Sequence, residues 1–238
     1  MEMKLPFKRR ALPLILLVIT GGAVKADEVF TVDLNTSPLT MSPGLLAGPF
    51  SLAFQLVQGS QPNNNKATIS AFNFGTGGSA GSGCPGVLSP CAFGGASGDI
   101  SSAILLNTSE FFNGSVEFFT PGSSLSFQVD LTTNVDSGGV PDAFAFSILD
   151  GSGLSIPTQD ASTADTLLTV DIDSASPAIL TYATDPSRST NNGAGVSITL
   201  DAPTTTPVTS AVPEPSSLLL LEAELAVLIG IVGRKQRG

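Results

Sequence analysis

The chain contains no histidine among its 238 residues. Histidine is the general base of Ser-His-Asp and Cys-His catalysis and a usual zinc ligand, so these mechanisms and sites are excluded. Tryptophan is absent and tyrosine occurs once, which leaves phenylalanine as the main aromatic residue. Phenylalanine lacks a polar group and suits a packed core, while sugar-binding proteins stack their ligands mostly on Trp and Tyr. Carboxylate chemistry of the glycosidase kind needs no histidine and is not excluded.

Positive charge is scarce in the middle of the chain. Between Asp27 and Val212 only Lys66 and Arg188 are basic, against sixteen Asp and Glu residues. A surface with so few cations cannot neutralise phosphates, so we expect no nucleic-acid partner. The acidity fits a protein that stays soluble outside the cell.

Residues 1–26 have the three parts of a secretory signal peptide. Four basic residues precede a short apolar run at residues 11–19, and Val24-Lys25-Ala26 places small residues where a signal peptidase cuts. We therefore expect cleavage after Ala26, which makes Asp27 the first residue of the mature protein. The alternative is an uncleaved anchor, but the run is shorter than the ~20 residues that span a bilayer.

The C-terminal residues 212–238 combine several features in a fixed order. Val212-Pro213-Glu214-Pro215 is followed by two serines, an apolar stretch at residues 218–232 and a basic end. This order resembles the PEP-CTERM sorting signal of Gram-negative bacteria. The resemblance implies recognition by an exosortase, a membrane-embedded cysteine transpeptidase, in bacteria that make exopolysaccharide or biofilm matrix. Basic residues after an apolar helix favour the cytoplasmic side, which leaves the rest of the protein outside.

Glu222 and Glu224 lie near the middle of the apolar stretch. Its ten Leu, Ile and Val residues favour insertion by about 4 to 5 kcal/mol in total. Two carboxylates cost roughly 2.5 to 3.5 kcal/mol each at mid-membrane and cancel that gain. The tail is therefore marginal as a permanent anchor. It suits a transient sorting segment, or a degenerate one that the exosortase handles poorly.

Apolar residues alternate with a period of two in the domain between these ends, residues 27–202. The clearest segments are residues 51–57, 124–131, 143–149, 166–172 and 195–200, and weaker patterns occur at 28–34, 67–72, 116–120 and 178–184. Turn sequences separate them, and helical patterns are missing. Many short strands of this kind predict an all-β domain, an antiparallel sandwich of the jelly-roll kind. Residues 203–211, rich in Thr and Pro, predict a polar linker to the tail.

The order of these segments also resembles a family of PEP-CTERM proteins of unknown function. The matching stretches cover most of residues 28–201 and read FSLAFQLVQGSQPNNNKATISAFNFG, SLSFQVDLT, DAFAFSILD and LLTVDID. The resemblance implies a fold and a location but no activity, and it carries no functional residues over to this chain.

Cys84 and Cys91 lie in the Gly-rich stretch of residues 75–98. In an exported chain, two cysteines this close are expected to form a disulfide that pins a loop. A metal site would need further ligands, and a catalytic thiol would need a base that the chain lacks. We therefore predict a structural disulfide.

Two acidic pieces, Asp150-Gly151-Ser152-Gly153 and Asp171-Ile172-Asp173, are candidates for part of a calcium site. Calcium needs six to eight oxygens from several segments, and neither piece has the spacing of an EF-hand. We interpret both as solvated acids at turns and strand ends, and predict no metal and no cofactor.

Three functions remain open at this stage. The favoured one is a non-enzymatic surface or matrix protein with a structural or adhesive role, exported and held at the inner membrane before sorting. Its expected partners are the signal peptidase, the exosortase and a membrane. The second is a carbohydrate-binding module for exopolysaccharide. The third, a hydrolase with paired carboxylates, lacks an acidic pair in an apolar setting, so we expect no enzyme.

Overall fold

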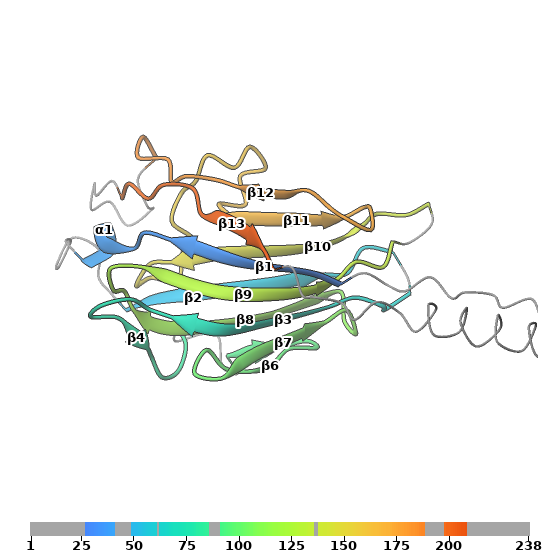
Figure 1. Ribbon diagram of the computed structural model, residues 1–238, viewed down its shortest axis with the longest axis horizontal. Coiled ribbons are helices and arrows are strands. Elements are labelled where there is room, and N and C mark those ends of the chain that lie inside the picture. Colours follow the sequence, from blue (N-terminus) through green and yellow to red (C-terminus); the bar gives the residue numbers. More distant parts are fainter. Residues whose placement is uncertain are drawn as a thin grey trace, which may run out of the picture.

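The computed structural model describes residues 27–40, 49–60, 62–85, 91–135, 138–188 and 198–208. They form two antiparallel sheets that share one hydrophobic core (Figure 1). The first sheet has the strand order β13-β1-β9-β3-β7-β6, and the second has the order β12-β11-β10-β2-β8-β4 with β5 also paired to β8. The all-β antiparallel class predicted from the sequence is confirmed.

The strands of the first sheet are β1 (Asp27–Leu34), β3 (Lys66–Asn73), β6 (Ser97–Gly98), β7 (Ala103–Asn107), β9 (Leu125–Thr132) and β13 (Thr204–Pro207). Those of the second are β2 (Phe50–Val57), β4 (Ser79–Ala80), β5 (Ala92–Phe93), β8 (Phe112–Thr120), β10 (Asp142–Leu149), β11 (Leu168–Ile172) and β12 (Ile179–Thr181). A single turn of helix, α1 (Ser37–Thr40), follows β1. None of the described residues belongs to a helix long and apolar enough to cross a membrane.

The chain alternates between the two sheets as it advances. It passes from β1 in the first sheet to β2 in the second, back to β3, on to β4 and β5, and so on until β10–β12 run as a meander in the second sheet. Outside this meander and the β6–β7 pair, neighbouring strands are distant in sequence, as in the pair β1 and β9 (Figure 1).

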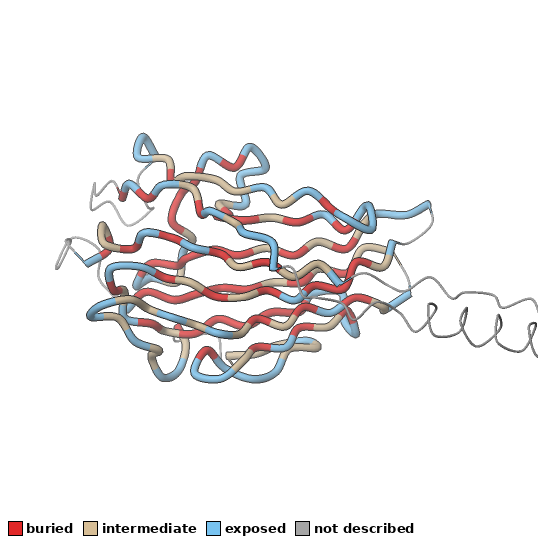
Figure 2. Tube along the Cα trace, in the orientation of Figure 1, coloured by how far each residue is buried: buried red, intermediate tan, exposed pale blue. Residues whose placement is uncertain are grey.

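Phenylalanines from both sheets meet in the core. Phe54 of β2, Phe127 of β9 and Phe146 of β10 are each at most 1% exposed, and their ring centroids lie 5.0 to 5.3 Å apart. Along β9 buried positions alternate with more exposed ones, whereas β2 and β10 each contain a run of consecutive buried residues, Phe50–Phe54 and Phe146–Leu149 (Figure 2). The faces predicted for residues 51–57, 124–131 and 143–149 are confirmed, because the apolar set of each strand points to the same interior.

A β-bulge on β3 changes which residues face the core. Two residues, Ala71 and Phe72, lie opposite the single residue Phe127 of β9, and Ala71 has a φ of 54°. Inward positions before the bulge include Ile69, and strict alternation would then bury Ala71 and expose Phe72. The extra residue reverses this, so that Phe72 and Phe74 pack against the core. The sequence pattern of residues 67–72 does not reveal the bulge.

The predicted linker is wrong over its described part. Thr204–Pro207 form β13, which pairs with Phe30–Asp33 of β1 at the edge of the first sheet. Threonine is β-branched and favours strands. Proline lacks an N–H group but is tolerated on an edge strand. Residues 209–211 lie outside the described residues.

The strand predicted at residues 195–200 is also not formed over its described part. Ile198 and Leu200 are buried in the core without belonging to a strand. The hydroxyl of Thr184 donates to the Ile198 carbonyl (2.8 Å) and accepts from the Leu200 N–H (2.7 Å). A threonine side chain thus replaces the ladder of a strand pair. The strand expected at residues 178–184 is shorter in the structure, where only β12 (Ile179–Thr181) forms.

Candidate functional site

The domain has two ends with different chemistry. Asp27 at the start of β1 pairs with Thr132, and Val208 after β13 donates from its N–H group to the carbonyl of Val29 (2.8 Å). Both limits of the domain therefore lie at one end, which we call the terminal end. It also carries the described parts of residues 57–66, 107–112, 132–142 and 172–178. The opposite end, called the far end, carries residues 34–40, 74–78, 120–125, 149–167 and the segments around Thr184 and Asp201.

The predicted disulfide is present, and the structure shows what it holds. The Cα atoms of Cys84 and Cys91 are 5.4 Å apart. On one side of the loop the carbonyl of Gly83 accepts from the Phe118 N–H (3.0 Å), and on the other the Cys91 carbonyl accepts from the Val116 N–H (2.8 Å). Both hydrogen bonds lie on the outer edge of β8, which β4 and β5 also cover. The disulfide therefore joins two parts of the segment that covers this edge. Covering a sheet edge prevents pairing with other chains.

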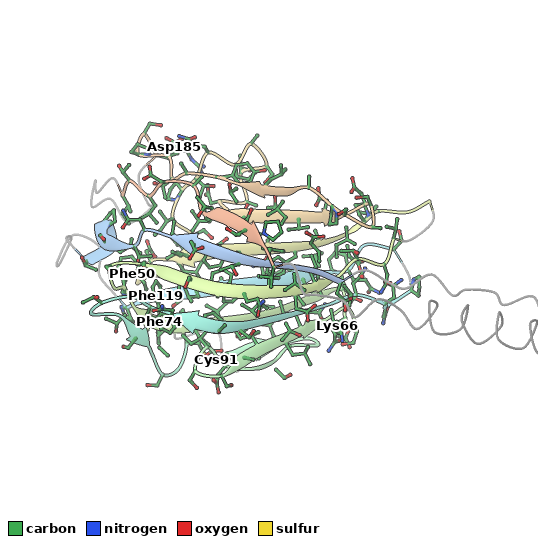
Figure 3. The ribbon with its side chains drawn as sticks, viewed as in Figure 1. Phe50, Lys66, Phe74, Cys91, Phe119 and Asp185 are labelled. Carbon is green, nitrogen blue, oxygen red and sulfur yellow. A yellow bond between two sulfur atoms is a disulfide. The ribbon has the colours of Figure 1, made fainter. Side chains whose placement is uncertain are left out.

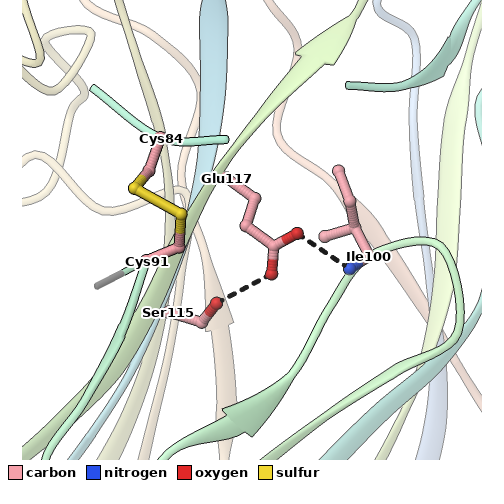
Figure 4. The surroundings of a disulfide bond; sticks show 5 residues. All are labelled: Cys84, Cys91, Ile100, Ser115 and Glu117. Carbon is pink, nitrogen blue, oxygen red and sulfur yellow. Dashed lines mark hydrogen bonds between the residues drawn. A yellow bond between two sulfur atoms is a disulfide. The ribbon is translucent and has the colours of Figure 1, made fainter. Parts of the chain in front are cut away.

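Glu117 lies between these two points on β8 and turns inward (Figure 4). Its side chain is 7% exposed. One carboxylate oxygen accepts from the Ile100 N–H (3.1 Å), and the other accepts from the Ser115 hydroxyl (3.1 Å). Burial raises the pKa of Glu117, although these hydrogen bonds act in the opposite direction and Asp99 adds to the rise. Since Ile100 belongs to the turn between β6 and β7, Glu117 links the two sheets.

A polar network built on Asn65 joins the loops of the terminal end. The Asn65 amide group donates to the Asp142 carboxylate (2.8 Å) and to the Asn134 carbonyl (2.9 Å). Its side-chain oxygen accepts from the Thr132 hydroxyl (3.2 Å) and from the Asn134 N–H (2.8 Å). Asp142 also accepts from the Gly59 N–H (2.7 Å). Asn65 and Asp142 are almost fully buried, so their hydrogen bonds hold the bases of the terminal-end loops together. The tips of these loops stay exposed to solvent.

An open groove of about 370 Å³ lies at the far end. Its rim contains two exposed carboxylates, Asp33 and Asp201, together with hydroxyl and amide groups of neighbouring residues. Thr36 and Ser37 anchor one wall by donating to the Gly122 carbonyl (2.8 Å) and the Ser123 carbonyl (3.0 Å). The groove can accept and donate hydrogen bonds to a polar ligand. None of the described residues that line it is aromatic, so these residues offer no platform for stacking a sugar.

The two basic residues of the domain do not form a positive patch. The Arg188 guanidinium makes a bidentate contact with Asp165, with N–O distances of 2.5 and 3.0 Å. This pairing raises the pKa of Arg188. Figure 3 shows Lys66 at the terminal end, and Asp185, three residues before Arg188, at the opposite end. The described surface is therefore acidic with two separated cations.

The two acidic pieces considered for calcium do not come together. Asp150 is buried at the far end, where its carboxylate accepts from the N–H groups of Ser152 (2.9 Å) and Leu154 (3.1 Å). Asp171 and Asp173 are exposed near the terminal end. Asp150 therefore shapes its own turn and is not the solvated acid that the sequence predicts. Among the described residues, no three acidic or thiol groups are placed to hold a metal ion.

Most of the remaining predicted site residues lie outside the part of the chain that the structure describes. The sorting motif Val212-Pro213-Glu214-Pro215, the glutamates Glu222 and Glu224, and Ala26 of the cleavage site lie outside the described residues. Asp27 is the first residue of β1. Sequence reasoning missed Glu117 and Asn65. The signal for Glu117 was a lone carboxylate within the apolar stretch Val116–Phe119, whereas nothing in the sequence distinguishes Asn65 from its neighbouring asparagines.

Comparison of the chain with protein-family models, curated proteins and solved structures finds no match.

Proposed function

We propose that this chain is an exported bacterial surface or matrix protein with a structural or adhesive role. In this proposal the signal peptidase removes residues 1–26, and an exosortase recognises Val212-Pro213-Glu214-Pro215 while the apolar stretch holds the protein at the inner membrane. The observation that carries the proposal is the order of motif, apolar stretch and basic end at residues 212–238.

Three structural features support this proposal. A disulfide closes the Cys84–Cys91 loop, as is common in compartments outside the reducing cytosol. The covered edge of β8 and the acidic surface suit a domain that must stay soluble outside the cell. The chain crosses between the two sheets several times before β10, although β4 and β5 share the second sheet and β6 and β7 share the first. These crossings support a sandwich of jelly-roll-like connectivity.

A pulse-chase experiment in a host with an exosortase tests the sorting route. Three forms are compared by mass and membrane fractionation: wild type, Pro213→Ala with Pro215→Ala, and Glu222→Ala with Glu224→Ala. The proline variant should remain unprocessed yet fractionate with membranes, because the motif precedes the apolar segment. The glutamate variant should bind membranes more strongly, since the change removes about 5–7 kcal/mol of insertion cost. Normal processing of the proline variant would refute the route.

The groove at the far end favours one alternative, binding of a polysaccharide. Asp33 and Asp201 offer acceptors for sugar hydroxyls at an open surface. Titration with exopolysaccharide from the host, followed by calorimetry, tests this. Asp33→Asn with Asp201→Asn should weaken binding, while Asp173→Asn, an exposed change at the other end, should not. Equal binding by both variants would remove the groove from consideration.

A further inference from the structure

Exposed apolar side chains gather at the terminal end. The described residues include eight large apolar side chains that are at least 36% exposed. Five of these eight lie at the terminal end: Phe111, Phe112, Val135, Val140 and Val208. Phe111 and Val140 are the most exposed, at 69% each. Phe112 is the first residue of β8, and the other four lie outside the named strands. Their clustering on an otherwise polar surface indicates a contact with an apolar partner.

Backbone hydrogen bonds and a buried polar network support the backbone behind these tips. The Gln58 N–H donates to the Phe111 carbonyl (2.9 Å), and the Ser60 N–H donates to the Val140 carbonyl (2.9 Å). Phe111 and Val140 therefore flank one short segment of backbone. The buried network of Asn65 and Asp142 lies behind them. The backbone that carries the tips is thus held in place, and the side chains extend from a fixed surface.

The same end carries both limits of the domain. The leader would precede Asp27, and the chain continues from Val208 to the apolar stretch that begins at residue 218. Nine residues separate these two points, and a fully extended chain of this length reaches about 30–35 Å. An apolar segment in a bilayer would therefore keep the terminal end within this distance of the lipid surface.

We propose that the terminal end is a membrane-contact surface, with Phe111 and Val140 entering the interface of a zwitterionic bilayer. The proposal rests on the proposed function, since the tail brings the domain to the membrane. Aromatic and aliphatic side chains on loop tips are the groups that gain by burial in the interface. The charges select the lipid: among the described residues at this end, Asp27, Glu28 and Glu110 outnumber the single cation Lys66. Anionic headgroups would be repelled, so contact requires neutral ones.

The absence of tryptophan makes a direct test possible. Phe111→Trp places one fluorophore at the terminal end, and Val140→Trp gives a second, independent probe there. Leu154→Trp is the matched control, because Leu154 is 41% exposed but lies at the far end. The full chain carrying each change is mixed with phosphatidylcholine vesicles whose acyl chains are brominated or not. Flotation measures vesicle binding, and the bromine atoms quench any tryptophan that enters the interface.

The proposal expects brominated lipid to quench both terminal-end probes by at least twofold and to leave the Leu154→Trp control unchanged. Replacing half the lipid by an anionic one should reduce that quenching. If the protein floats but neither terminal-end probe is quenched, or the control is quenched equally, the membrane-contact surface is refuted while anchoring by the tail stands. Failure to float would refute both. A blue shift without vesicles that dilution removes would assign the surface to a second copy of the chain and refute the proposal.

Discussion

Glu117 provides the sharpest test of how the two sheets are held together. Two substitutions separate its roles. Glu117→Ala removes both hydrogen-bond acceptors, whereas Glu117→Gln removes the charge and keeps the shape. The glutamine can still accept from the Ile100 N–H through its oxygen and donate to the Ser115 hydroxyl through its nitrogen.

The magnitudes follow from the burial of the groups involved. Ile100 is 2% exposed, so Glu117→Ala leaves its N–H group without an acceptor and away from water. An unsatisfied buried donor costs about 1–3 kcal/mol, and we expect the free energy of unfolding to fall by that amount at pH 7. Glu117→Gln should be at least as stable as wild type at pH 7, because it removes a carboxylate that burial disfavours.

The pH dependence has a definite sign. Burial raises the pKa of Glu117 in the folded state above its ordinary value of 4.5. The folded protein therefore binds more protons than the unfolded chain between these two pKa values. The stability that protonated Glu117 contributes is present below pH 4.5 and is lost as the pH rises through the folded-state pKa. Glu117→Gln lacks this loss, so its stability relative to wild type should increase across the same window and then level off.

Urea denaturation followed by circular dichroism at a series of pH values measures both effects. The matched control is Glu110→Gln, an exposed carboxylate near the start of the same strand, which should change stability by less than about 0.5 kcal/mol. Equal stabilities of the alanine and glutamine variants would show that the hydrogen bond to Ile100 contributes nothing. A difference between Glu117→Gln and wild type that does not vary with pH would refute the raised pKa.

Three further predictions concern the fold. Replacing Cys84 and Cys91 by serine should lower the free energy of unfolding by about 2–3 kcal/mol, which is the loop-closure entropy of so short a loop. Urea denaturation measures this change, and a value below about 0.5 kcal/mol would show that the disulfide does not stabilise the fold. Ala71→Gly should raise the melting temperature slightly, because glycine adopts the positive φ of this position without strain, and a lowered value would contradict the bulge. Phe127→Asp should abolish soluble folding, while Gln128→Lys on the opposite face should be almost silent; similar solubility of the two would refute the assigned faces.

The alternation of apolar and polar residues was enough to predict the all-β class and the buried face of each strongly alternating strand. Leu125, Phe127 and Val129 alternate with polar residues, and this period of two follows from backbone geometry within the strand, so it needs no knowledge of a partner. The disulfide could also be predicted from the sequence, because only six residues lie between the two cysteines of a chain that is expected to be exported.

The pairing of strands and the roles of isolated polar residues depend on contacts between distant parts of the chain, which no local pattern predicts. Thr204 pairs with Asp33 across most of the chain, and no local pattern encodes a contact of that range. The bulge at Ala71 exists because Phe72 and Phe74 must face a core supplied by other strands. Likewise the hydrogen bond from the Ile100 N–H to Glu117 joins the β6–β7 turn of the first sheet to β8 of the second, so it depends on how the two sheets pack. Local residues set the faces of the strands, and distant ones decide which strand lies beside which, because pairing depends on the packing of the whole core.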